Sequence, residues 1–303
     1  MQSVLVTGAT GFIGKHTLPL LLSRGFDVHA VSSKPISQNN NYTWHQADLL
    51  NIKETNNLLS KVSPTHLLHF AWYTNPKNYY ISHLNLKWLY ASLNLLEAFK
   101  NTGGKRAIFA GTCAEYEWKY PSYTENKTPL IPSTLYGTCK HSLQEILFSY
   151  SQENKLSSAW ARIFFLFGPR EHPDRLVSFV IRSLLANKVA PLSEGSQLRD
   201  FLYVEDVASA FVSILESDVE GPVNIGSGKG MSVRDLVEMI CDKMNKWADV
   251  FLIGNLQDLK EPFGRGLSLH YLWLLLFLLR WGQYRRQQNH LTQFDEKILP
   301  MAY

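Results

Sequence analysis

Short continuous apolar runs alternate, through the first half of the chain, with longer stretches in which apolar residues recur every three or four positions. The short runs are typical of strands that are buried on both faces, and the longer stretches are typical of helices. The expected strands cover residues 4–6, 26–31, 44–49, 66–72 and 106–110, and a sixth strand ends at residues 168–170. The first expected helix ends near residue 24, and three others cover residues 51–62, 81–100 and 135–147. Because strands alternate with helices, the pattern predicts an α/β protein with a doubly wound parallel sheet.

The first expected strand runs directly into a glycine-rich turn, Thr7-Gly8-Ala9-Thr10-Gly11-Phe12-Ile13-Gly14, from which a helix starts. We expect Gly8 to allow the sharp turn, Gly11 to let a pyrophosphate approach the backbone, and Gly14 to let the helix pack closely on the strand. The free N–H groups and positive dipole end of such a helix suit phosphates. The context favours a Rossmann-type dinucleotide site over a tight turn without a ligand.

The end of the second strand bears on which dinucleotide binds. NAD sites place an acidic residue there for the ribose 2′-hydroxyl, whereas this chain has Ser32, Ser33 and Lys34. Two hydroxyls and a cation suit a 2′-phosphate, so NADP(H) is favoured and NAD(H) is the alternative. A third interpretation is a solvated loop that has no role in cofactor binding. Ala71 falls near the end of the fourth strand, at the sheet edge where open α/β sheets bind ligands.

Tyr136 and Lys140 are four residues apart in the helix over residues 135–147, so they share one face. A phenol has a pKa of about 10, and a lysine ammonium one turn away favours the phenolate. Thr112, at the end of the fifth strand, can donate a hydrogen bond to a substrate oxygen. A proton donor and a polariser of the oxygen are what hydride transfer to a carbonyl needs beside the hydride donor.

The sequence resembles the extended short-chain dehydrogenase/reductase family, the NAD(P)-dependent nucleotide-sugar epimerases, dehydratases and reductases. The resemblance extends from residue 2 to about residue 260. The matching segments are the glycine turn, Asp48-Leu49, Thr112 four residues before Tyr116, Tyr136-Gly137-Thr138-Cys139-Lys140, residues 162–164 with 167–169, residues 199–208, and Asn224-Ile225-Gly226-Ser227-Gly228.

The resemblance implies a catalytic trio of Thr112, Tyr136 and Lys140, with Lys140 also on the nicotinamide ribose. It implies a nucleotide-sugar substrate, contacted by Cys113 and by Arg199, whose guanidinium would hold the diphosphate. No metal is implied. The residues expected to contact the dinucleotide, besides Tyr136 and Lys140, are Gly8, Gly11, Phe12, Ile13, Gly14, Ser32, Ser33, Lys34, Asp48, Leu49 and Ala71.

We expect residues 1–168 to form the dinucleotide-binding domain, to which residues 222–228 return, and residues 169–262 to form a smaller C-terminal substrate-binding lobe.

Two departures from the family bear on the reaction. Family dehydratases carry an Asp-Glu pair where this chain has Cys113 and Ala114, and Glu115 comes one residue late, where a strand would face it the other way. Phe165 replaces an Asn that reaches the substrate in many members.

Dehydration is therefore disfavoured, and we expect a nucleotide-sugar reductase or epimerase. Reduction of a 4-keto-6-deoxyhexose is the specific hypothesis, with a 4-epimerase as the first alternative. A dinucleotide-sensing protein without turnover is the second alternative, although such proteins often lack the Tyr or the Lys that this chain keeps at Tyr136 and Lys140.

Composition agrees with a cytoplasmic enzyme. The 303 residues carry a net charge of only +4, so nucleic acid is not an expected partner. Three widely spaced cysteines, Cys113, Cys139 and Cys241, fit a reducing compartment and no metal site. The chain starts directly with a strand, so no secretory leader is expected, and a homodimer is a possible assembly.

Residues 263–303 depart from the family, whose members end in a helix on the substrate lobe. Residues 267–279 are almost wholly apolar but shorter than the about 20 residues of a membrane-spanning helix, and residues 280–290 are polar and basic. One explanation is an ending unrelated to the family's, for instance through a change of reading frame, which would leave the substrate lobe incomplete. The other is a peripheral membrane or partner contact.

Overall fold

The computed structural model describes residues 2–36, 41–120, 122–246 and 250–252. Its central feature is a seven-stranded sheet in the order β10-β6-β5-β4-β1-β2-β3, in which the recorded neighbours pair in parallel. The strands of this sheet are β1 (Ser3–Thr7), β2 (Asp27–Ser32), β3 (Thr43–Gln46), β4 (His66–His69), β5 (Arg106–Thr112), β6 (Ser157–Ile163) and β10 (Gly221–Ile225). The predicted doubly wound parallel sheet is confirmed.

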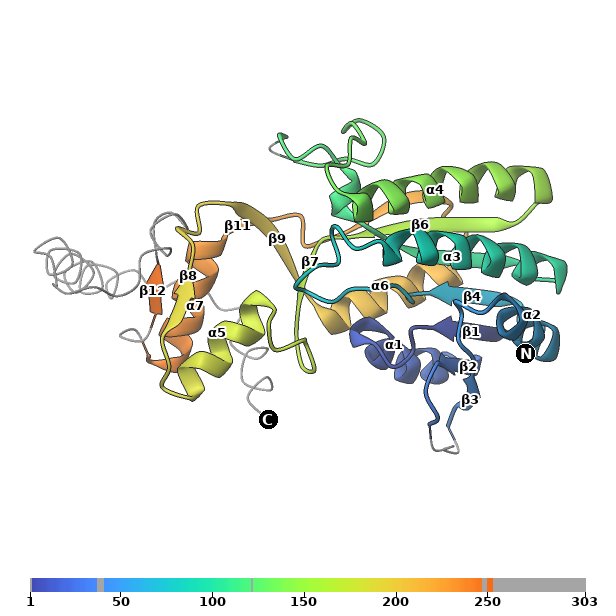
Figure 1. The fold of residues 1–303 in the computed structure, drawn as a ribbon, viewed down its shortest axis with the longest axis horizontal. Helices are drawn as coiled ribbons and strands as arrows, with labels where there is room; N and C mark the ends of the chain where they lie inside the picture. Colours follow the sequence, from blue (N-terminus) through green and yellow to red (C-terminus); the bar gives the residue numbers. More distant parts are fainter. Residues whose placement is uncertain (1, 37–40, 121, 247–249, 253–303) are drawn as a thin grey trace, which may run out of the picture. The chain divides into compact units, whose positions relative to one another are not determined.

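Helices cover both faces of this sheet (Figure 1). Helices α2 (Ile52–Val62), α3 (Leu84–Asn101) and α4 (Leu135–Asn154) contribute Leu58, Leu95 and Leu143 to one buried cluster. Helices α1 (Phe12–Ser23) and α6 (Val204–Glu216) contribute Leu18 and Phe211 to a second cluster. The central strands β1, β4 and β5 are almost wholly buried because they lie between these two apolar layers.

The chain leaves the large sheet after Ile163 and starts a second, smaller one. The sequence predicts one strand ending at Gly168, but the structure has β6 up to Ile163 and a separate β7 (Phe165–Phe167). Phe164 donates its N–H to the carbonyl of Ile225 (3.1 Å), and β7 then pairs with β9 (Leu198–Tyr203) in a sheet of order β11-β9-β7 with β11 (Gly230–Ser232). The third strand is also shorter than expected, since β3 ends at Gln46.

Contacts divide the chain into two units, Met1–Arg175 with Arg199–Met231, and Leu176–Leu198 with Ser232–Tyr303. The first unit thus holds the whole seven-stranded sheet together with β9 and α6. In the second unit, α5 (Leu176–Leu185) and α7 (Val233–Met244) accompany β8 (Ala190–Leu192), which pairs with β12 (Val250–Leu252). The boundaries expected from the sequence, at residues 168, 222–228 and 262, remain a prediction of which region binds the dinucleotide and which binds the substrate.

The apolar stretch over residues 267–279 and the basic stretch after it lie outside the described residues. Within the described residues, no helix is both long enough and apolar enough to cross a bilayer.

Candidate active site

The glycine turn between β1 and α1 brings three chain segments into close contact. Gly8 has a φ of +66°, which favours glycine, and a Cβ there would lie 2.7 Å from the amide nitrogen of Ala71. A Cβ on Gly14 would collide with the carbonyl oxygen of Gly8 and with Ala9. Gly11 closes the turn by donating its N–H to Gly8 (2.9 Å). The turn therefore has the close-packed geometry that the sequence predicts.

The N-terminus of α1 is suited to an anion. Gly11 occupies the N-cap without a side chain to satisfy the first N–H groups, and the first turn holds no acidic residue. Phe12 and Ile13, two of the expected cofactor contacts, are the first helical residues and are half-buried. Backbone donors and the positive helix end at this point fit the pyrophosphate of a dinucleotide.

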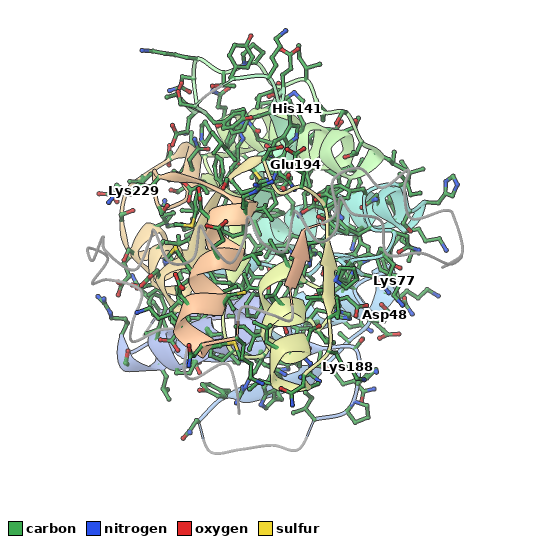
Figure 2. The ribbon with its side chains drawn as sticks, turned by 90° about the vertical axis from the view of Figure 1, so that its left-hand side faces the viewer. Asp48, Lys77, His141, Lys188, Glu194 and Lys229 are labelled. Atoms are coloured by element: carbon green, nitrogen blue, oxygen red, sulfur yellow. The ribbon has the colours of Figure 1, made fainter. Side chains whose placement is uncertain are left out.

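The ends of neighbouring parallel strands meet at the same edge of the sheet. Ser32 is buried at the end of β2, and its Oγ accepts from the N–H of Lys34 (3.1 Å), while Ser33 and Lys34 are exposed. Asp48, labelled in Figure 2, is exposed, and its Oδ1 accepts from the N–H of Leu50 (3.0 Å). The predicted cofactor contacts on β1, β2, β3 and β4 thus follow strands that are neighbours.

The two remaining expected cofactor contacts at this edge of the sheet, Leu49 and Ala71, are both buried. Ala71 donates its N–H to the hydroxyl of Thr7 (3.3 Å). His69, just before it, is a core residue, because its ring nitrogens contact Thr7 (2.7 Å) and Ser92 (2.8 Å) and burial lowers its pKa to about 3.

Thr112 and Tyr136 lie together although they come from different elements. Thr112 ends β5, and its hydroxyl caps the short helix η1 (Cys113–Glu115) by accepting from the N–H of Ala114 (3.2 Å). The side chain of Thr112 lies close enough to the phenol of Tyr136 to lower its pKa. Gly137 makes this approach possible, because a Cβ there would collide with the carbonyl oxygen of Ala114. Gly137 belongs to the Tyr136–Lys140 motif, but its role could not be predicted from the motif alone.

Burial controls the acid–base properties of Tyr136 and Lys140. Burial raises the pKa of Tyr136, and the neighbouring Thr112 side chain opposes that rise. Burial also lowers the pKa of Lys140 to about 7, and Glu115 opposes that change. The expected lowering of the phenol pKa is not seen, because burial outweighs the charges near Tyr136. The Nζ of Lys140 donates to the carbonyl of Ala110 (2.8 Å).

Glu115 is part of a buried polar network that sequence reasoning missed. It lies in η1 rather than on a strand, and its Oε2 accepts from the Nε of Arg162 (2.8 Å), with both side chains fully buried. Its carboxylate also accepts from the N–H of Thr112 (2.8 Å) and from the indole of Trp160 (3.0 Å). The carboxylate nearest to the dehydratase positions is thereby held in the core.

Of the two expected substrate residues, Arg199 lies beside aromatic side chains of the same unit and Cys113 lies in the core. The Cζ of Arg199 lies 4.8 Å from the centre of the Trp118 ring and 5.0 Å from that of Phe165. Cys113 is buried, and burial raises its pKa to about 12. Trp118 sits in an irregular segment without periodicity, so the sequence carried no signal for it.

Comparison with known proteins agrees with this geometry. The UDP-glucuronate 4-epimerase of Thermodesulfobacterium geofontis is 25% identical over 262 residues, which cover 79% of this chain and 80% of that protein. The UDP-glucuronic acid decarboxylase 1 of Xenopus tropicalis is 26% identical over 289 residues, or 91% of this chain and 68% of that protein. The structure of a UDP-glucose 4-epimerase from Thermus thermophilus in complex with NAD has a TM-score of 0.76 at 24% identity and covers 99% of both chains, which supports the fold.

The sequence profile of one family matches residues 4–226. The match contains the glycine turn, the helix with Tyr136 and Lys140, and the strand that ends at Ile225. It covers well over half of the chain, and the resemblance stated from the motifs is confirmed: the chain belongs to the NAD dependent epimerase/dehydratase family.

Proposed function

We propose that this protein is an NAD(P)-dependent enzyme that acts on the sugar of a nucleotide-sugar, most specifically as a reductase of a 4-keto-6-deoxyhexose. The observation that supports the proposal best is the buried contact between Thr112 and Tyr136, with Lys140 one helical turn away. Thr112 ends β5, and the next two strands of the sheet, β4 and β1, lead to Ala71 and to the glycine turn.

Each residue of the trio has a distinct role in this proposal. A bound dinucleotide supplies the hydride that is exchanged with the sugar carbon. Tyr136 transfers a proton to or from the sugar oxygen, and the Thr112 hydroxyl holds that oxygen by a hydrogen bond. Lys140, when charged, favours the ionised state of Tyr136 during proton transfer and can bind a ribose hydroxyl.

The surroundings of the trio argue against elimination of water. Cys113 and Ala114 offer no carboxylate at the dehydratase positions. Glu115 is bonded to Arg162, Trp160 and the backbone of Thr112, so moving it toward a substrate would leave a buried guanidinium unpaired. A reductase or an epimerase needs no such carboxylate.

A 4-epimerase is the second candidate, favoured by the activity named for the Thermodesulfobacterium geofontis relative. Epimerisation uses the same trio, but oxidation and reduction occur on one bound sugar and the dinucleotide is regenerated. The two candidates therefore differ in whether reduced dinucleotide is consumed.

The proposed cofactor is NADP(H). Ser33 and Lys34 are exposed after β2, where a 2′-phosphate would lie, and Ser32 shapes the turn by accepting from Lys34. A hydroxyl and an ammonium can neutralise and hydrogen-bond a phosphate, whereas an NAD site would gain more from a carboxylate.

Turnover assays separate the candidates. The full chain is incubated with NADPH and a series of 4-keto-6-deoxyhexose nucleotides, and loss of reduced dinucleotide is followed together with the sugar product. In a second series, UDP-glucose and UDP-glucuronate are supplied without reduced dinucleotide, and 4-epimers are sought by chromatography.

Consumption of NADPH with a 6-deoxyhexose product supports the reductase, and a 4-epimer without consumption supports the epimerase. Binding of dinucleotide with no turnover of any sugar supports the sensing protein. Tyr136→Phe serves as the control for both enzyme readings, because it should abolish either activity and leave dinucleotide binding intact.

A further inference from the structure

We propose that Trp72 is a positioning residue for Lys140, whose ammonium it holds against the face of its indole ring. This inference deepens the proposed function, because Lys140 matters for turnover only if the trio is catalytic. Trp72 follows β4, next to the predicted cofactor contact Ala71, whereas Lys140 lies on α4. The sequence spacing between the two gives no sign of their contact.

The ammonium of Lys140 is held from two directions. Its Nζ lies 3.9 Å from the centre of the Trp72 ring and donates a hydrogen bond to the carbonyl of Ala110 (2.8 Å). A second indole, that of Trp160, lies farther away at 5.9 Å. Lys140 is 3% exposed and Trp72 is 9% exposed. A cation over an indole face is attracted most strongly when both are removed from water, as they are here.

The ring of Trp72 is itself fixed in orientation. Its Nε1 donates to the Oδ1 of Asn85 (2.8 Å), and Asn85 is fully buried at the start of α3. The amide of Asn85 donates in turn to the carbonyls of Tyr79 (2.7 Å) and Ser82 (2.9 Å). The indole also meets the ring of Tyr136 edge to face, at 6.3 Å and 74°. Trp72 thus touches both members of the Tyr136–Lys140 pair from one anchored position.

The charges around Lys140 make this support necessary. Among the residues that the structure describes, no carboxylate forms an ion pair with Lys140, and the nearby Glu115 is paired with Arg162. His69 of β4 has a pKa of about 3 and is therefore neutral, and burial raises the pKa of Cys139 and Tyr136, which are also neutral near pH 7. Apart from the charge of Glu115, which already has a partner in Arg162, the indole face and one carbonyl stabilise the ammonium.

The proposal predicts a direction for the pH dependence. Burial lowers the pKa of Lys140 to about 7, and the Trp72 face favours the charged form, so removing that face should lower the pKa further. Because the reaction uses charged Lys140, turnover falls as pH rises through this pKa. The alkaline limb of the kcat profile should therefore move to lower pH in Trp72→Leu, by about 1 pH unit.

The experiment compares Trp72→Leu, which keeps apolar bulk, with Trp72→Phe, which keeps an aromatic face of weaker attraction. Trp88→Leu is the matched control, since Trp88 packs on Trp72 (6.4 Å) within the same cluster. The full chain is labelled with ¹³C at the ε carbons of lysine, and the Lys140 signal, assigned with Lys140→Arg, is titrated by NMR. The pH profile of kcat is measured in parallel.

We expect the Lys140 titration and the alkaline limb to move down in pH for Trp72→Leu, to move less for Trp72→Phe, and to stay in place for Trp88→Leu. An unchanged Lys140 titration in Trp72→Leu overturns the proposal. If Trp72→Leu does not fold, Trp72→Phe decides by the same criterion. The NMR titration needs no substrate, so it decides the role of Trp72 even where turnover assays contradict the proposed function.

Discussion

The Oε2 of Glu115 lies 2.8 Å from the Nε of Arg162, in an ion pair whose two side chains are both fully buried. Removing one partner from such a pair leaves an uncompensated charge in the core, which costs about 3–5 kcal/mol. We therefore expect Arg162→Met to lower the free energy of unfolding by that amount, measured by urea denaturation with tryptophan fluorescence.

The control for this prediction is Arg24→Met, which breaks a partly exposed pair with Glu216 (3.1 Å). Exposed pairs contribute about 0–1 kcal/mol because water screens them. Equal losses in the two variants would show that burial does not set the strength of the Glu115–Arg162 pair.

Tyr136→Phe should lower kcat by about 100-fold or more, the usual scale for a general acid or base. The ring, and with it the packing against Trp72 and Tyr79, is retained, so the dissociation constant of NADPH should not change. Steady-state kinetics and a fluorescence titration measure the two quantities. Tyr150→Phe removes a hydroxyl from the same helix α4 and serves as the control. Normal turnover in Tyr136→Phe would contradict the catalytic assignment.

The chain should bind NADPH at least several-fold more tightly than NADH, because Ser33 and Lys34 suit a 2′-phosphate. Lys34→Ala should weaken NADPH binding and leave NADH binding nearly unchanged, since only the phosphate loses a partner. Ser33→Asp should reverse the preference, by offering a carboxylate to the 2′-hydroxyl and repelling a 2′-phosphate. Titration of both dinucleotides into each variant measures these affinities, and equal affinities in the unaltered chain would refute the NADP(H) assignment.

Arg199→Lys should raise KM for the nucleotide-sugar about 10-fold or more, while kcat changes little. A lysine cannot form the bidentate bond to a diphosphate, and it loses the stacking on Trp118 and Phe165. Arg182→Lys, at an exposed position of α5, is the control. A change in kcat with an unaltered KM would place Arg199 in the chemical step rather than in substrate binding.

The parts of the fold that depend on local spacing could be predicted from the sequence. The turn at Gly8, Gly11 and Gly14 is set within eight consecutive residues, and Tyr136 and Lys140 share a helix face because they are four residues apart. The split of the strand after Ile163 was not predicted, because β7 pairs with β9, a strand that comes much later in the chain.

The surroundings of the candidate site depend on long-range contacts and escaped the sequence argument for that reason. The sequence pattern placed Glu115 on a strand, facing away from the site. In the structure it lies in the short helix η1, where its side chain is buried and pairs with Arg162. The contacts of Trp72 with Lys140 and of Trp118 with Arg199 join segments that have no common periodicity. The homodimer and the role of residues 263–303 stay predictions.

One edge strand of the large sheet, β10, is also the last strand of that sheet to be synthesised. It pairs with β6, with Asn224 opposite Arg162, and Asn224 accepts a hydrogen bond from the hydroxyl of Tyr116 (2.8 Å). A nascent chain that ends before residue 221 displays the unpaired backbone of β6, which invites pairing with other chains. Premature termination upstream of β10 should therefore yield an aggregating fragment rather than a partly active one. The backbone of β6 is protected from pairing with other chains only late in translation, after β10 has been synthesised.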